Sequence, residues 1–420
     1  MTISRLLLVS ALVVLSPACS DPSASDRNPD MSSLPGDGGQ AACSAAAITY
    51  RHGNESPQQP IVHVLSKAKY PLALCNDGTP GAYVFRPGVG GGAKRWIIYL
   101  EGGGLCGDAA SCKLRYDTTP FYMTSSGTTD GQVYPTLLEG LKSTDMAVNP
   151  DFRDANLVQL YYCSSDTWSG DRAGDGALPT DNLGRWHFRG RSIISAVLAE
   201  LLPQGLATAE EVLLTGSSAG AIGVVSNADD VRQALPAAVR YVAMMDAGFF
   251  INYPDFDSKT NLESTAMPTM RELELTSAVA AWGGRGDASC EAAATDSAAH
   301  TRCRSVYDVL RAGYVQTPLF IRQSVYDMVQ LKMLVPVPPQ DAAGKAALKA
   351  YGLRFAQTLV QDLKSLSGIS VFATNDTRHG VINSTSEWST TTVDTLLLPA
   401  VFGAWYANPC AAPVTHIATP

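Results

Sequence analysis

The stretch Leu213–Gly223, LLTGSSAGAIG, places Ser218 between two glycines in the pattern Gly-x-Ser-x-Gly. An apolar run, Val212–Thr215, precedes the motif, and a helix-compatible segment follows it. In this context the pattern predicts a sharp strand-to-helix turn, where small neighbours let a strained serine project from the end of a sheet. The same pattern also occurs in ordinary turns. A nucleophilic role for Ser218 therefore requires partners elsewhere in the chain.

Among the six histidines, His379 stands where a base for Ser218 is expected. In folds with this turn, the order along the chain is serine, acid, histidine, and the histidine follows the last strand of the sheet. His379 lies in NDTRHGVINS, directly after the expected strand Ile369–Thr374. The remaining histidines lie before the serine, in the segment that follows it, or near the C-terminus: His52, His63, His187, His300 and His416.

Two aspartates are candidates for the acid that would orient the histidine. Asp246 ends the first expected strand after the serine, and Asp327 follows the second. The acid usually follows the second strand, which favours Asp327; it would hold the imidazole in one tautomer and stabilise its cation. Asp246 then has a structural role or lines the pocket.

A nucleophilic serine also needs hydrogen-bond donors for an oxyanion, and a glycine-rich loop is placed to supply one. The segment LEGGGLC, Leu100–Cys106, places three glycines directly after an expected strand. Such a loop lends a backbone N–H to an oxyanion in lipases and esterases, and the residue after the nucleophile, Ala219, supplies the second N–H. With all four parts present, we interpret Ser218 as a nucleophile.

Six apolar runs read as buried strands, a pattern typical of a parallel sheet covered on both faces. They are Trp96–Leu100, Ala155–Cys163, Glu211–Gly216, Val239–Asp246, Thr317–Asp327 and Gly368–Asp376. Amphipathic patterns over Arg191–Leu202 and Leu353–Leu366 predict helices between strands. The alternation predicts one large α/β domain over residues 43–420, interrupted at about 247–316 by a cap-like insertion.

The N-terminus indicates export. Arg5 precedes the apolar run Leu6–Leu15, which is too short to span a bilayer and fits a signal peptide over residues 1–19. Ser16–Cys19 is similar to a bacterial lipoprotein cleavage box, although its leucine lies four residues before Cys19 instead of three. Membrane attachment through a lipidated Cys19 and plain secretion both remain open. Residues 20–42 read as a disordered tether.

Of the nine cysteines, eight remain once Cys19 is set aside, an even number suited to disulfides in an oxidising compartment. Spacing alone leaves the pairing open, with Cys106–Cys112 and Cys290–Cys303 as the favoured local pairs. The cysteines and histidines show no close metal-binding spacing, so we expect no metal and no organic cofactor. A net charge of −8 without a basic patch argues against nucleic-acid binding.

Six motifs together resemble those of the pectin acetylesterase and Notum family of carboxylesterases. They are CNDGTPGAYVF (Cys75–Phe85), YLEGGGLC (Tyr99–Cys106), YYCSSDTWSG (Tyr161–Gly170), FRGRSII (Phe188–Ile194), GSSAGAIG (Gly216–Gly223) and DAGFF (Asp246–Phe250). The resemblance implies an α/β-hydrolase fold: a mostly parallel sheet flanked by helices.

The resemblance also implies roles for particular residues. It implies the triad Ser218, Asp327 and His379, with an oxyanion hole formed by backbone groups of Gly103 and Ala219. The family's cysteines imply Cys75–Cys163 beside Cys106–Cys112, which leaves Cys43 to pair with Cys410. Residues expected to bind substrate lie in the loops around the serine: Gly104, Leu105, Asp166, Trp168 and Ser217.

The expected activity is hydrolysis of short acyl esters, such as acetyl groups on a polysaccharide like pectin. The alternative is a long-chain or protein-acyl esterase similar to Notum, and a non-catalytic surface binding protein is a third interpretation. Two departures from the family pattern bear on acyl-chain preference. Leu105 stands where relatives have a tryptophan, and Ala221 replaces a common glycine. The oligomeric state is not predictable from the sequence.

Overall fold

The computed structural model describes residues 55–420, except 134–137, 173–185, 267 and 269–280. The expected signal segment, the tether, Cys19 and Cys43 lie outside the described residues.

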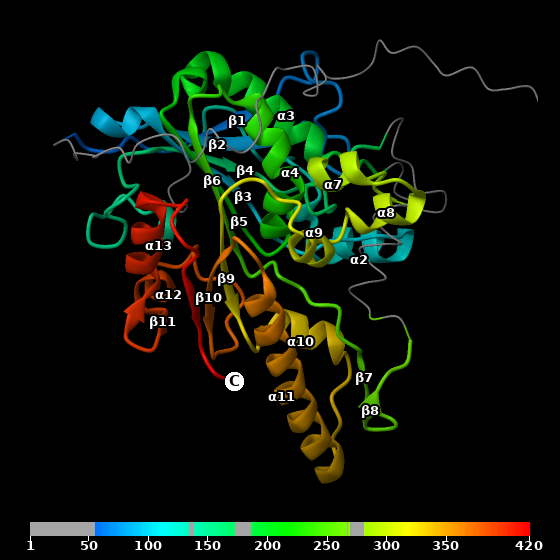
Figure 1. The fold of residues 1–420 in the computed structure, drawn as a ribbon. Coiled ribbons are helices and arrows are strands. Elements are labelled where there is room, and N and C mark those ends of the chain that lie inside the picture. The colour runs from blue at the N-terminus through cyan, green and yellow to red at the C-terminus, as the bar shows by residue number, and fades with distance from the viewer. Residues whose placement is uncertain (1–54, 134–137, 173–185, 267, 269–280) are drawn as a thin grey trace, which may run out of the picture.

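A nine-stranded sheet forms the centre of the domain, in the order β1-β2-β4-β3-β5-β6-β9-β10-β13 (Figure 1). The strands are β1 Ile61–Val64, β2 Ala82–Arg86, β3 Arg95–Leu100, β4 Asn156–Leu160, β5 Glu211–Ser217, β6 Arg240–Asp246, β9 Leu319–Ser324, β10 Ser370–Thr374 and β13 Thr415–Ile417. From β4 to β13 every pair of neighbours is parallel, whereas β1 and β2 are antiparallel to their neighbours. The expected mostly parallel sheet is confirmed.

All six expected strands are present as β3, β4, β5, β6, β9 and β10. Three strands were not expected: β1, β2 and β13. Two of these, β1 and β13, lie at the edges of the sheet and are partly exposed, so they lack the continuous apolar run that marks a central strand.

Helices cover both faces of the sheet (Figure 1). The α-helices are α2 Ala109–Thr118, α3 Gly190–Leu201, α4 Ala219–Ala234, α7 Ala288–Ala293, α8 Ser297–Arg302, α9 Val306–Ala312, α10 Met328–Leu334, α11 Ala342–Ser365, α12 Thr385–Thr390 and α13 Leu398–Ala407. Short 3-10 helices lie at Gly90–Lys94, Pro120–Tyr122, Gly140–Lys142, Leu202–Gln204 and Leu206–Thr208. None of the α-helices in the described ranges is long and apolar enough to cross a membrane.

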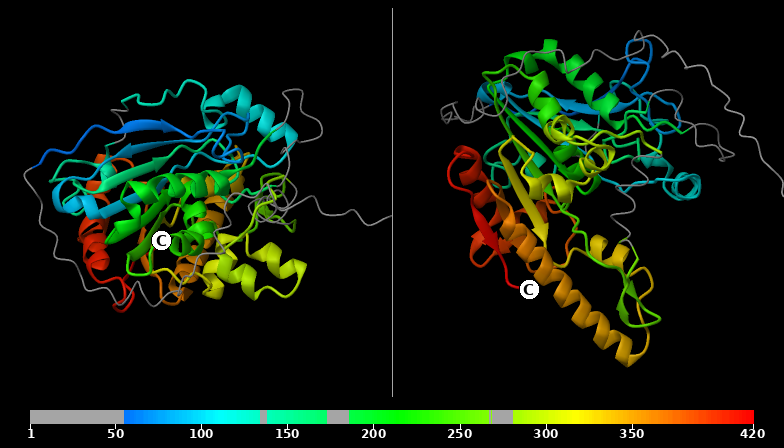
Figure 2. Two further views of the ribbon diagram at one scale, coloured as in Figure 1. Left: turned by 90° about the horizontal axis from the view of Figure 1, so that it is seen from above. Right: turned by 45° about the vertical axis from the view of Figure 1, so that its right-hand side comes forward.

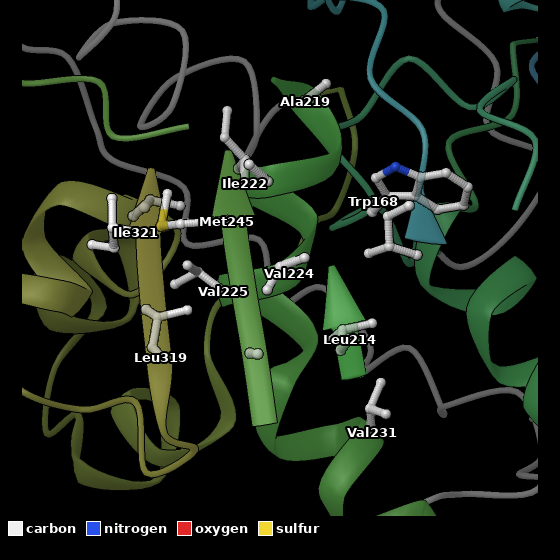
Figure 3. Close-up of a cluster of buried hydrophobic side chains, with 14 of the residues drawn as sticks. Trp168, Leu214, Ala219, Ile222, Val224, Val225, Val231, Met245, Leu319 and Ile321 are labelled. Atoms are coloured by element: carbon white, nitrogen blue, oxygen red, sulfur yellow. The ribbon is translucent and has the colours of Figure 1, made fainter. Parts of the chain in front are cut away.

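Alternate residues of each strand supply two separate cores, because successive side chains point to opposite faces of a sheet. Leu214 and Met245 pack with α3, α4, α9 and α11, whereas Leu213 and Met244 pack with α12 and α13. Figure 3 shows the first core, where side chains of α4 such as Ile222 gather with those of β5, β6 and β9.

The expected helix over Leu353–Leu366 begins earlier than its pattern indicates. α11 starts at Ala342, where the Asp341 carboxylate accepts a hydrogen bond from the N–H of Gly344. The first half of α11 is largely exposed, so no apolar stripe marks it in the sequence. The aspartate cap, and not a hydrophobic face, sets where this helix begins.

The segment between β6 and β9 corresponds to the expected insertion, and its described residues lie outside the central sheet. They contain the small hairpin β7–β8, Phe256–Asp257 and Leu262–Glu263, and the helices α7, α8 and α9. The hairpin lies beside α11, and Glu263 pairs with Arg354 near the middle of that helix at 2.9 Å (Figure 2). A disulfide between Cys290 and Cys303 ties α7 to the end of α8.

Three disulfides are formed within the described residues, all of them among the expected pairs. Cys75–Cys163 joins the segment before β2 to the end of β4, and Cys106–Cys112 closes the loop between β3 and α2. Cys410 is also disulfide-bonded, but its expected partner Cys43 lies outside the described residues.

Two carboxylates are buried where α7 packs against α4. Asp287 caps α7 by accepting a hydrogen bond from the N–H of Cys290, and Asp229 of α4 accepts one from the Ser289 hydroxyl. Burial, together with repulsion from Asp229, raises the pKa of Asp287 to about 7. Asp287 therefore keeps its proton in the folded protein at pH values where the unfolded chain has released it.

We expect the free energy of unfolding to fall as pH rises from about 4, the pKa of an unfolded aspartate, to about 7, where folded Asp287 ionises. Asp287→Asn keeps an oxygen for the Cys290 N–H and removes the ionisation, so its stability should change less over this window. Urea unfolding of both proteins at about pH 5 and about pH 8 measures the difference. The same pH dependence in both proteins would contradict this assignment.

Candidate active site

Ser218 occupies a strained turn between β5 and α4, as its motif predicts. Its backbone angles are φ 59° and ψ −124°, a conformation that is rare for residues other than glycine. The turn is possible because its neighbours are glycines: a Cβ at Gly220 would collide with the carbonyl oxygen of Leu100, and one at Gly216 would lie 2.6 Å from the Gly220 oxygen. Ser218 itself is partly exposed.

His379 lies on the loop after β10 and reaches Ser218. Its Nε2 atom is 2.8 Å from the Ser218 Oγ, and its Nδ1 atom is 2.8 Å and 2.9 Å from the two carboxylate oxygens of Asp327. The His379 side chain is 15% exposed, whereas that of Asp327 is 1% exposed. Three residues from distant parts of the chain thus form one continuous hydrogen-bonded row.

Asp327 is fixed by three further donors. It caps α10, where its Oδ1 accepts hydrogen bonds from the backbone N–H groups of Val329 and Gln330 at 3.0 and 3.1 Å. The Gln323 side-chain amide donates to Oδ2 at 3.2 Å. These donors set the orientation of the carboxylate toward His379. The sequence analysis missed Gln323, because a glutamine inside an apolar strand carries no motif.

The loop after β3 packs directly against the serine. A Cβ at Gly102 would lie 2.9 Å from the Ser218 Cβ, so only a glycine lets the two backbones approach this closely. Gly103 and Gly104 both have positive φ, 144° and 76°, and the Tyr122 ring packs on Gly103. Ala219 is the first residue of α4, and the first N–H groups of a helix have no partner within it.

The sequence and the fold both match known proteins. The Pectinacetylesterase family model covers residues 54–417. The chain belongs to the pectinacetylesterase family. Pectin acetylesterase 11 of Arabidopsis thaliana is 29% identical over 296 residues, 70% of this chain and 69% of that protein. Palmitoleoyl-protein carboxylesterase NOTUM of Homo sapiens is 30% identical over 346 residues, 79% of this chain and 63% of that protein.

The structure of the Wnt deacylase Notum from Drosophila matches this fold with a TM-score of 0.72 at 25% identity. The match covers 86% of this chain and 97% of that one. Together with the sheet order, it establishes the α/β-hydrolase fold. The family membership makes the chain a carboxylic ester hydrolase, since relatives on both branches are named carboxylesterases or acetylesterases.

Of the esterase's expected substrate-binding residues, two lie in the loop after β3. Gly104 is exposed, and its carbonyl oxygen accepts a hydrogen bond from the Tyr162 hydroxyl at 2.9 Å. Leu105 is partly buried against the cluster that contains Trp186 and Trp282. Both lie in the glycine-rich loop, in which Gly102 is the residue that contacts Ser218.

The other three residues are buried and face into the protein. Asp166 accepts hydrogen bonds from the Ser164 hydroxyl and from the backbone N–H groups of Trp168 and Gly190. The Trp168 indole packs on Gly223 of α4 and donates to the Glu101 carbonyl at 2.9 Å. Ser217 donates to Asp246 at 3.0 Å. These side chains support the loops around the site, and the structure shows none of the three presented to a substrate.

Asp246, the second candidate for the acid, does not contact His379 through a hydrogen bond. Its carboxylate is completely buried beneath the loop that carries His379. Of the two aspartates, Asp327 is therefore the one that contacts the His379 ring. No group of three metal-ligating side chains occurs among the residues that the structure describes.

Replacing Asp327 by asparagine should lower kcat by about 10⁴-fold, as the same change does in a serine protease triad, because the amide stabilises the wrong histidine tautomer. Ester turnover at saturating substrate measures the loss. Asp341→Asn is the matched control, since Asp341 is also a helix cap but lies at the start of α11. Because asparagine caps helices as well as aspartate does, equal activity loss in both variants would contradict the role of Asp327.

Proposed function

We propose that this protein hydrolyses carboxylic esters through a Ser218–His379–Asp327 triad and an acyl-enzyme intermediate. The observation that supports the proposal most directly is the 2.8 Å contact between His379 Nε2 and Ser218 Oγ, with Asp327 at the opposite nitrogen. A hydroxyl, a base and a buried anion in this order are the parts that serine acyl transfer requires.

The reaction begins with neutral His379 donating its Nδ1–H to Asp327. As the Ser218 oxygen bonds to the ester carbonyl carbon, Nε2 takes the hydroxyl proton and the carbonyl electron pair moves to oxygen. The N–H groups of Gly103 and Ala219 stabilise this oxyanion. The carbonyl then re-forms, the alcohol leaves with the proton from Nε2, and the acyl group stays on Ser218.

Water completes the cycle by the same chemistry. His379 takes a proton from water as the water oxygen bonds to the acyl carbon, and the proton returns to Ser218 when the acid leaves. The protein's own groups account for every proton transfer in this cycle.

We propose short acyl esters of a polysaccharide, such as acetyl groups on pectin, as substrates. The Arabidopsis relatives are named pectin acetylesterases. Phe249 and Phe250, which follow β6, are packed into the core, and the Phe250 ring centroid lies 6.3 Å from that of His379. A bulky side chain packed beside the histidine favours a small acyl group. The Notum relatives, named palmitoleoyl-protein carboxylesterases, support the alternative of a long acyl chain on a protein.

Export is also part of the proposal. The apolar N-terminal run fits a signal peptide, and the disulfides within the described residues suit an oxidising compartment. Lipidation at Cys19 would keep the enzyme at a membrane surface, and cleavage without lipidation would release it.

Ser218→Ala should abolish ester hydrolysis while the protein stays folded, because the alanine removes the nucleophile and leaves the turn intact. Hydrolysis of 4-nitrophenyl acetate measures activity, and circular dichroism measures folding. Ser195→Ala on α3 serves as the control, since that hydroxyl bonds only within its own helix. Full turnover by a folded Ser218→Ala protein would place the nucleophile elsewhere.

The acyl preference is tested with 4-nitrophenyl esters of increasing chain length. We expect kcat/KM for the acetate to exceed that for the octanoate, because packed aromatic side chains leave little room next to the triad. Release of acetate from acetylated pectin, measured in parallel, tests the polysaccharide. Preference for the octanoate would favour the long-chain alternative.

A further inference from the structure

The Asp246 carboxylate receives hydrogen bonds from both segments that carry the reacting side chains. Its Oδ2 accepts the Ser217 hydroxyl at 3.0 Å and the backbone N–H groups of Val381 and Ile382 at 2.8 and 3.2 Å. Ser217 immediately precedes Ser218, and Val381 lies two residues after His379. One oxygen atom thus connects the turn of the serine to the loop of the histidine.

The two segments meet at close range beside this oxygen. A Cβ at Gly380 would lie 2.5 Å from the Ser217 Oγ and 3.4 Å from the Asp246 Oδ2. Gly380 also has a positive φ of 83°. The loop therefore has no side chain at the point of contact, and the position of His379 relative to Ser218 depends on how firmly Asp246 holds both backbones.

Arg322 supplies the opposite charge on the other side of the carboxylate. Its Nη1 lies 3.3 Å from the Asp246 Oδ1, and both side chains are completely buried. Its Nη2 donates to Ser324 at 2.6 Å and lies 3.7 Å from Asp376. An anion with three donors on one oxygen and a guanidinium on the other is stable here, whereas a neutral amide would leave Arg322 without its full counter-charge.

The same guanidinium reaches the start of the histidine loop. The Ser324 hydroxyl, which accepts from Arg322, contacts Asp376 and the Arg378 carbonyl oxygen, each at 2.6 Å. Burial acts to raise the pKa of Asp376, but hydrogen bonds from Arg378 and Ser324 outweigh it and hold the pKa at about 2. Asp376 is therefore an anion at neutral pH. The loop that carries His379 is thus held on the N-terminal side of this residue through Arg322, and on the C-terminal side through Asp246.

We propose that Asp246, with Arg322 as its counter-ion, is a positioning residue that sets the distance between His379 and Ser218. The inference rests on the proposed serine mechanism and adds to it a residue outside the triad. Asp246 reaches no substrate. It acts by holding the base within hydrogen-bonding distance of the nucleophile, so its loss should lower kcat more than it raises KM.

A second buried carboxylate in the same sheet provides a matched control. Glu211, at the start of β5, pairs with Arg95 at 2.7 Å and Arg240 at 3.0 Å, and accepts a hydrogen bond from Tyr406. It is as buried and as well paired as Asp246, but it lies at the opposite end of β5 from Ser217. Its loss should destabilise the fold without moving the histidine loop.

The experiment compares Asp246→Asn with Glu211→Gln in the full chain. We expect both to lower the melting temperature, because each leaves a buried arginine without its full counter-charge. At a temperature where both are folded, only Asp246→Asn should lower kcat for 4-nitrophenyl acetate, on the order of 10²-fold, the loss expected for a misplacement near 1 Å. Its KM should stay close to that of the unchanged protein. Equal kcat values in the two variants would overturn the proposal.

Ser217→Ala gives a second test in case Asp246→Asn does not fold. It removes one of the three donors and no charge, so folding should be kept while kcat falls with KM unchanged. An unchanged kcat in a folded Ser217→Ala protein would overturn the proposal. Failure of the underlying mechanism is distinguishable, because it appears as hydrolysis by Ser218→Ala, whereas failure of the positioning role leaves Ser218→Ala inactive.

Discussion

The contact between the β3 loop and the turn at Ser218 is the constraint on which the site depends. The Leu100 carbonyl lies where any side chain at residue 220 would be, and Gly102 lies against the Ser218 Cβ. Because these backbones touch, the sheet itself brings the glycine-rich loop and the start of α4 together at Ser218. The pairing of β3 with β5, which aligns Leu100 with Gly216, fixes this contact in register. The glycines are needed for this close approach. The strained φ of Ser218 persists because the packed backbones on both sides hold the turn in this conformation.

Charged side chains are buried at both ends of the parallel strands. At one end Glu211 is bonded to two arginines and a tyrosine, and at the other Asp246 is bonded to Arg322 and to three donors. Burying a charge costs several kcal/mol even after relaxation, and pairing returns about that amount. Such pairs are therefore a poor source of net stability. They instead fix the relative positions of the groups around them, because a carboxylate that accepts several hydrogen bonds holds its donors in one arrangement.

The sequence predicts those parts of the proposed site whose chemistry is tied to chain order. Ser218 is marked by its glycines, His379 by its place after the last expected strand, and Asp327 by the strand that precedes it. These signals exist because the fold admits few positions for each part. The central strands are recognisable for a similar reason, since both of their faces are buried and their apolar runs are continuous.

Other features depend on contacts that no local pattern records. Asp166 and Trp168 lie in a motif that predicts a place at the substrate, yet their side chains bond to the backbone of neighbouring loops. Gln323 and Arg322 are polar residues within an apolar strand, and only the folded arrangement shows that one contacts Asp327 and the other Asp246. Edge strands and the exposed half of α11 lack a buried face to generate a pattern.

The two candidate substrate classes differ in the length of the acyl chain that the site must hold. The proposed triad does not distinguish between them. In the proposed mechanism Ser218, His379 and Asp327 act only on the carbonyl carbon and its two oxygens, which an acetyl and a palmitoleoyl ester share. Discrimination must come from side chains that meet the acyl chain beyond the carbonyl. Phe250, whose ring lies 6.3 Å from that of His379, is placed for this, and Leu105 packs on a separate cluster behind the glycine-rich loop. In this proposal, acyl-chain preference depends on the side chains packed around the triad and not on the triad itself.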